Sequence, residues 1–185
     1  MRLRTSLLAL AVLTLAAACS PGGPTDAAAK ADWDVPCPKD SGETTAADFE
    51  KFTLECLSDG EDHHLGALDD RPMVITLWAS WCGPCRAEAP AFKEFHAKME
   101  DKVNLIGVDT QDSAAAAKSF AEDAGWRFPS VIDTDGAVMK SQGITTLPAT
   151  FFIGSDGKTA VTYNEGELTT EKLLRAAQKH LGVAP

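Results

Sequence analysis

The chain has 185 residues, of which 44% are hydrophobic, so it is long enough for one domain with a substantial core and rather short for two. Its formal net charge is −10. An acidic surface of this kind repels phosphate backbones, which argues against nucleic-acid binding. We therefore expect a single acidic domain, acting as a monomer, whose partners are not nucleic acids.

The N-terminus is typical of a signal peptide. Residues 1–18 contain two arginines, then an apolar run, then small residues before Cys19. The run is shorter than the roughly 20 apolar residues that span a bilayer. The letters LAAAC also resemble the lipobox of bacterial lipoproteins, although Ala16 stands where leucine is usual. We expect lipidation of Cys19 and export to the outer face of the bacterial cytoplasmic membrane; ordinary cleavage and secretion is the alternative.

The segment that follows Cys19 is rich in Pro, Gly and Ala and poor in bulky apolar residues. Such a composition favours a flexible tether over 19–36, between the membrane and a folded domain over 37–185. A plain disordered N-terminus is the alternative if Cys19 carries no lipid.

Hydrophobic patterning predicts an α/β domain. Strands are expected where apolar and β-branched residues run together, and helices where apolar residues recur at helical spacing. In chain order we expect a hairpin within 49–65, a strand at 73–80, a helix at 85–99, a strand at 103–109, a helix at 113–125, a strand at 130–133, a short helical stretch to 142, strands at 145–154 and 158–163, and a closing helix at 168–182.

The letters WCGPC place Cys82 and Cys85 two residues apart at the predicted strand-to-helix junction. The pair is a redox couple, half of a metal site or a short structural disulfide. Disulfide exchange needs an attacking thiolate and a second thiol close enough to resolve the mixed disulfide, and this spacing supplies both. At the first turn of a helix, Cys82 meets free backbone N–H groups and the positive end of the helix dipole, which lower a thiol pKa. We expect Cys82 to be the nucleophile and Cys85 to be the more buried resolving thiol.

A metal site is the weaker interpretation of the pair. Structural zinc requires four ligands, and the sequence has no second C-x-x-C and no histidines at matching spacing. The neighbours His63 and His64 offer copper ligands on paper, but we interpret them as a solvated hairpin edge. We expect neither a metal nor an organic cofactor.

Several motifs together resemble the thioredoxin superfamily. They are WCGPC, Pro90 five residues after Cys85, and an isolated Pro148 at the start of a later strand. The export signal, the sequence WASWCGPCRAEAP and the extra strand and helix over 103–125 are similar to the TlpA/ResA-like membrane-anchored thiol-disulfide oxidoreductases. The resemblance implies a thioredoxin-like fold, with a central mixed sheet flanked by helices, an N-terminal hairpin and an inserted strand-helix unit.

The resemblance also assigns roles near the cysteines. The buried acid that cytosolic thioredoxins carry six residues before the first cysteine corresponds to Thr76, and Glu88 is the acid expected to matter instead. If buried, Glu88 has a raised pKa and exchanges protons with Cys85; an exposed helix carboxylate is the alternative. A cis bond before Pro148 is expected to let Leu147 pair with an incoming peptide.

Two further side chains have open roles. Trp81 either covers the disulfide, where it meets substrate, or fills the edge of the core. Cys37 and Cys56 are the cysteines that remain once lipid and active site are assigned, and we expect them to form a structural disulfide in the exported protein; two separate buried thiols are the alternative.

The sequence thus predicts an extracytoplasmic protein-disulfide reductase that acts on exported protein thiols or disulfides and is re-reduced by a membrane electron-transfer partner. An oxidase of exported proteins uses the same residues and is the main alternative. A non-enzymatic copper-delivery protein is disfavoured, because relatives of that class generally have three residues between the cysteines.

Overall fold

The computed structural model describes residues 35–39 and 44–185. The predicted signal peptide, Cys19 and all but the last two residues of the predicted tether lie outside these residues. No helix within the described ranges is long and apolar enough to cross a membrane.

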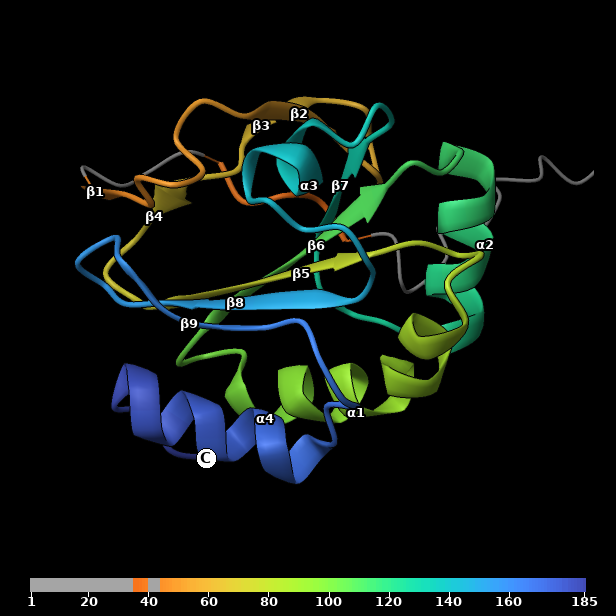
Figure 1. The fold of residues 1–185 in the computed structure, drawn as a ribbon. Helices are drawn as coiled ribbons and strands as arrows, with labels where there is room; N and C mark the ends of the chain where they lie inside the picture. The colour runs from red at the N-terminus through yellow and green to blue at the C-terminus, as the bar shows by residue number, and fades with distance from the viewer. Residues whose placement is uncertain (1–34, 40–43) are drawn as a thin grey trace, which may run out of the picture.

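A mixed sheet of seven strands, in the order β3-β2-β7-β6-β5-β8-β9, forms the centre of the domain (Figure 1). Strands β5, β6 and β7 run parallel, while β2, β3, β8 and β9 pair antiparallel to their neighbours. The strands are β2 Thr53–Cys56, β3 Asp62–His64, β5 Met73–Trp78, β6 Asn104–Thr110, β7 Ser130–Asp133, β8 Ala149–Ile153 and β9 Thr159–Tyr163. The short strands β1 Thr44–Thr45 and β4 Ala67–Leu68 form a separate pair.

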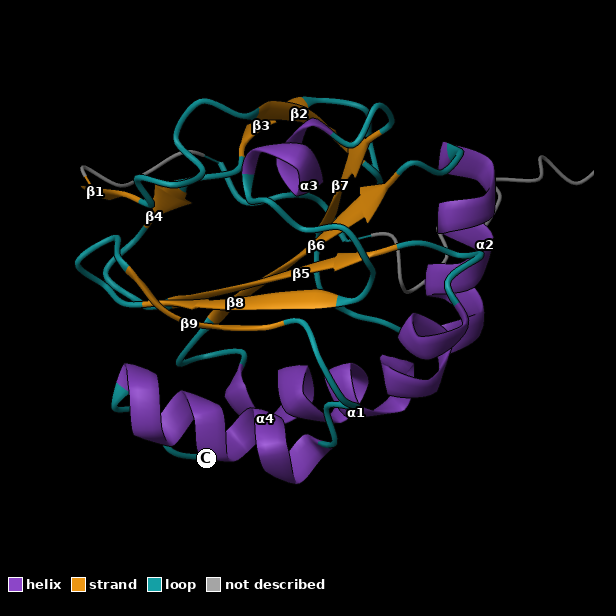
Figure 2. Cartoon of the chain, in the orientation of Figure 1, coloured by secondary structure: helices purple, strands orange, loops and turns teal. Residues whose placement is uncertain are grey.

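Helices cover both faces of the sheet (Figure 2). They are α1 Gly83–Met99, α2 Ala114–Ala124, α3 Ala137–Ser141 and α4 Thr170–Ala176, which continues as a π-helical turn over Ala177–Leu181. One core cluster joins α1, α2 and α4 to the sheet, and a second cluster on the opposite face includes Phe49, Val138 and Phe151. All six residues of β5 are buried because both of its faces are covered, which explains their continuous apolar run.

The predicted architecture is confirmed. The hairpin, the inserted β6-α2 unit and the order of strands and helices agree with the thioredoxin-like expectation. The helix predicted over 113–125 agrees with α2, which begins after Ser113, whose hydroxyl accepts a hydrogen bond from the N–H of Ala116, and ends at Gly125 with φ +64°.

The hairpin differs from the prediction at one side chain. His63 was expected at a solvated edge, but it is only 3% exposed, and its Nδ1 lies 3.0 Å from the carbonyl oxygen of Pro38. The cause is the segment 35–39, which lies against the hairpin and covers His63. That segment is joined to the end of β2 by a disulfide between Cys37 and Cys56, whose Cα atoms are 5.9 Å apart.

Candidate active site

Cys82 and Cys85 form a disulfide where the chain leaves the carboxyl end of β5 and enters α1. Cys82 is the N-cap residue, and its Sγ accepts a hydrogen bond from the N–H of Cys85 at 3.2 Å. Pro84 occupies the first turn, where a missing N–H costs no helical hydrogen bond. The Cys82 sulfur therefore meets a backbone donor at the positive end of a 17-residue helix, an environment that stabilises a thiolate.

The expected difference in burial between the two cysteines is absent. Cys82 is 4% and Cys85 is 3% exposed, so both are buried in the disulfide form. The surrounding cluster of apolar side chains includes both cysteines as well as Trp78 and Ala89. Burial alone thus does not assign the nucleophile, and the argument for Cys82 depends on its position at the helix N-terminus.

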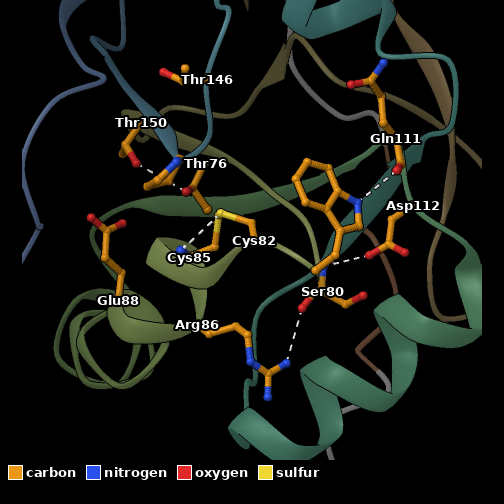
Figure 3. The surroundings of a disulfide bond; sticks show 12 residues. Thr76, Ser80, Cys82, Cys85, Arg86, Glu88, Gln111, Asp112, Thr146 and Thr150 are labelled. Carbon is orange, nitrogen blue, oxygen red and sulfur yellow. Dashed lines mark hydrogen bonds between the residues drawn. A yellow bond between two sulfur atoms is a disulfide. The ribbon is translucent and has the colours of Figure 1, made fainter.

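Glu88 is buried rather than exposed, with 2% of its surface accessible. It lies one turn after Cys85 on α1, and Figure 3 shows it on the same helix as the cysteines. Its Oε1 accepts a hydrogen bond from the N–H of Leu168 at 2.8 Å, while Oε2 has no partner among the described residues. Burial raises the pKa of Glu88, the Leu168 hydrogen bond opposes this, and the nearby charge of Glu167 raises it further. A protonatable carboxyl therefore lies next to the active-site helix turn.

Thr76 occupies the buried strand position where the resemblance places an acid in cytosolic thioredoxins. It is 1% exposed, and its hydroxyl oxygen accepts a hydrogen bond from the hydroxyl of Thr150 on β8 at 3.2 Å (Figure 3). This pair is neutral and supplies no carboxyl near the disulfide. The buried carboxyl on α1 is that of Glu88.

A cavity of about 320 Å³ opens beside Pro84, which lies between the two cysteines in the chain. Its lining includes Pro84 and Glu88 from α1, Leu147 and Pro148 before β8, and Leu168 before α4. The peptide bond between Leu147 and Pro148 is cis, as expected. The predicted substrate-contacting residue Leu147 and the predicted proton-exchange residue Glu88 thus share one cavity.

Trp81 lies on the surface. Its side chain is 60% exposed, and its indole N–H donates to the carbonyl oxygen of Gln111 at 3.0 Å. The alternative in which it fills the edge of the core is therefore wrong. Exposed next to Cys82, Trp81 is available for contact with a partner protein.

A set of polar contacts around Ser80 did not emerge from sequence reasoning. The N–H of Ser80 donates to Oδ2 of Asp112 at 2.6 Å, and its carbonyl oxygen accepts from the guanidinium of Arg86 at 3.2 Å (Figure 3). The available signal was the polar sequence DTQD after the predicted strand at 103–109, because the carboxyl ends of neighbouring parallel strands meet at one edge of a sheet. These contacts connect the loop after β6 to the loop that leads into Cys82.

Within residues 35–39 and 44–185, no group of three or more His, Cys, Asp or Glu side chains is arranged to hold a metal ion. The paired histidines contribute no such group, since His63 faces Pro38 and Nδ1 of His64 lies 3.2 Å from the carbonyl oxygen of Phe52.

The Redoxin family profile matches residues 42–177, which span the whole of this site. The chain belongs to the Redoxin family. This Redoxin is 32% identical over 116 residues to the thiol-disulfide oxidoreductase ResA of Bacillus thuringiensis subsp. konkukian, an alignment that covers 62% of this chain and 66% of that protein. A ResA of Bacillus cereus is 31% identical over 122 residues, covering 65% of this chain and 70% of the relative. The chain spans just under two thirds of the first of these relatives.

Solved structures agree with the sequence relatives. MTB DsbF, described in mixed oxidised and reduced forms, superposes on this Redoxin with a TM-score of 0.64 and 29% sequence identity. The match covers 74% of this chain and 98% of that structure. The TlpA/ResA-like resemblance and the thioredoxin-like fold are thereby confirmed.

Proposed function

We propose that this Redoxin is an extracytoplasmic thiol-disulfide oxidoreductase that reduces disulfides in exported protein partners. The observation that carries the proposal is the Cys82–Cys85 disulfide at the N-terminus of α1, where Cys82 Sγ accepts a backbone hydrogen bond. The names of the similar ResA proteins support the same reaction class.

The reaction exchanges one disulfide for another. In the reduced protein the Cys82 thiolate attacks a partner disulfide, which forms a mixed disulfide and releases one partner thiolate. The Cys85 thiol loses its proton and attacks Cys82, which closes the Cys82–Cys85 disulfide and releases the second partner thiolate. The partner gains two electrons, and a membrane electron-transfer partner must return them for the next turnover.

Glu88 is the proposed proton acceptor for Cys85. Its carboxyl is one turn away on the same helix, buried, and shifted toward the protonated form. A carboxyl with a raised pKa accepts a proton at a pH where an ordinary exposed carboxylate is too weak a base. The neutral Thr76–Thr150 pair supplies no such acceptor.

The proposed partner surface combines the cavity with the exposed indole. Leu147 and Pro148 line one side of the cavity, and Trp81 is exposed near Cys82. An extended peptide segment that carries a disulfide fits this surface, with backbone pairing at Leu147 and apolar contact at Trp81.

The direction of exchange is inferred from the residues between the cysteines. Neither Gly83 nor Pro84 offers a side-chain hydrogen bond or charge that would strongly stabilise the Cys82 thiolate. Thioredoxin has a potential of about −270 mV, whereas the oxidant DsbA is near −120 mV because its reduced form is stabilised. We therefore assign this chain to the reducing side, with lipidated Cys19 holding it at the outer face of the cytoplasmic membrane.

The test combines trapping with a potential. Cys82→Ser should abolish exchange, whereas Cys85→Ser should accumulate mixed disulfides with exported proteins. Faster alkylation of reduced Cys85 than of Cys82 at neutral pH would reverse the assignment. A potential for the Cys82/Cys85 couple above about −180 mV would favour the oxidase, which is the second candidate because it needs the same residues.

A further inference from the structure

Asp109 is a fully buried carboxyl that the exchange reaction does not use. It lies near the end of β6 with 0% of its surface exposed, and neither of its oxygens accepts a hydrogen bond from a described backbone or side-chain donor. An ionised carboxylate without donors in such a place is costly. Burying the neutral acid costs much less free energy, because its O–H can donate a hydrogen bond to a neighbouring acceptor.

That acceptor is Asp112. The carboxyl of Asp112 lies close enough to that of Asp109 for a proton on one of them to be donated to the other. The second carboxylate already serves backbone donors: Asp112 Oδ2 accepts from the N–H of Ser80 at 2.6 Å, and Oδ1 accepts from the N–H of Ser113 at 2.7 Å. The proton therefore belongs to Asp109, and the charge belongs to Asp112.

The pair is attached to the loop that carries Cys82. Ser80 lies two residues before the nucleophile, and the N–H of Cys82 donates to the carbonyl oxygen of Ala79 at 3.1 Å. The loop after β6 makes a second contact through Gln111, whose carbonyl oxygen accepts the Trp81 indole N–H. Gln111 has φ +53°, the sole positive value at a non-glycine residue among the described residues.

We propose that Asp109 and Asp112 share a proton in a carboxyl pair that fixes the backbone of Ser80, positions the loop entering Cys82, and releases that loop when the proton is lost. The titrating member is Asp109: burial, the adjacent Asp112 and the charge of Asp133 raise its pKa to about 8. Burial acts to raise the pKa of Asp112, but hydrogen bonds from Ser80, from the Ser113 backbone and from Asp109 act against it, and the pKa of Asp112 lies below its ordinary value.

The other groups near the pair do not replace the proton. Asp133 at the end of β7 is itself acidic, and its Oδ2 accepts a hydrogen bond from the Thr110 hydroxyl at 2.9 Å. Arg86 of α1 donates to the carbonyl oxygen of the clamped residue rather than to either carboxyl. Lys118 of α2 donates to the carbonyl oxygen of Ser58. On β5, the register neighbour of Asp109 is the uncharged Trp78.

The decisive experiment uses the oxidised protein, in which no active-site thiol titrates. Nuclear magnetic resonance follows the Asp109 ¹³Cγ and the Ser80 amide from pH 6.5 to 9.5. We expect both to change together with a midpoint of about pH 8. Asp109→Asn should remove the Ser80 transition. Asp112→Asn should move the Asp109 midpoint to lower pH, because it deletes the neighbouring negative charge.

Controls separate this pair from the buried carboxyl of Glu88. Glu88→Gln should leave the Ser80 transition in place. The inference is overturned if Ser80 shows no transition in the natural protein, if Asp109→Asn retains it, or if Glu88→Gln abolishes it. Should Asp109→Asn fail to fold, the ¹³Cγ titration of the natural protein and the Asp112→Asn shift still decide the question.

Coupling to exchange, which rests on the proposed function, has a separate readout. The rate of reduction by dithiothreitol is compared between the natural protein and Asp109→Asn, so that ionisation of the reagent cancels in the ratio. We expect the rate of the natural protein divided by that of Asp109→Asn to be constant below pH 7 and to fall about threefold by pH 9. The fall is expected because the negative charge of ionised Asp109 and the released loop both slow attack by an anionic thiolate. If this ratio does not change with pH while the Ser80 transition is observed, the positioning role is rejected, and the proposed exchange reaction is unaffected.

Discussion

Replacing both Cys37 and Cys56 by alanine removes the covalent link between the segment 35–39 and the end of strand β2. We expect the domain to keep its fold and lose stability. Cys56 is 1% exposed, so alanine is the suitable replacement, because serine would bury a hydroxyl group at this position.

The expected loss follows from the length of the closed loop. The two cysteines are 19 positions apart, and in the chain-entropy treatment a crosslink over a loop of this length reduces the entropy of the unfolded chain by an amount worth about 3 kcal/mol. For a domain of this size each kcal/mol changes the melting temperature by about 2–4 °C. The double variant should therefore melt roughly 6–12 °C lower.

Urea unfolding at pH 7 measures the loss. The cleanest background is Cys82→Ser with Cys85→Ser, because a single disulfide then remains and the active-site couple cannot contribute. In that background, reducing the disulfide between Cys37 and Cys56 should lower the free energy of unfolding as much as the alanine replacements do. A loss below about 1 kcal/mol in both comparisons would refute the loop-closure reasoning.

Two other predictions concern Glu88 and Cys19. Because burial raises the pKa of Glu88, the folded state holds a proton that the unfolded state releases, so stability decreases as pH rises from the ordinary carboxyl range through the raised pKa. Glu88→Gln should flatten that decrease in urea unfolding between pH 4 and 8, and parallel curves for the two proteins would contradict it. Cys19→Ala should release the protein from the membrane fraction, whereas a natural protein whose N-terminus carries no acyl chain in mass spectrometry would exclude the anchor.

The sequence was sufficient for the fold wherever one strand or helix determined its own boundaries. The β-branched and apolar run at β5 predicted a strand covered on both faces, and its six residues are buried. The helix predicted over 113–125 agrees with α2, whose ends in the structure are capped by Ser113 and Gly125. The C-x-x-C spacing likewise located the disulfide, because two intervening residues bring both sulfurs to one helix turn.

Contacts between distant segments were beyond local patterns. His63 has neighbours typical of a surface turn, yet it is buried by residues 35–39, which are about 25 positions earlier in the chain. The hydrogen bond between Ser80 and Asp112 joins residues 32 positions apart. Such pairs depend on which strands become neighbours in the sheet, and hydrophobic periodicity does not encode that choice.

The replacement of a buried acid by Thr76 has a consequence for how protons reach the disulfide. The Thr76–Thr150 pair is neutral, and the buried carboxyls of Glu88 and Asp109 lie on two different elements, α1 and β6. Glu88 is bonded to the N–H of Leu168, so its protonation is connected to the segment that leads into α4. Asp109, through Asp112, is connected to the loop before Cys82. In the proposed mechanism, changes in pH thus act on the resolving cysteine through a helix contact and on the attacking cysteine through a loop contact. Because the two carboxyls are separate, we expect single substitutions to remove one effect and leave the other.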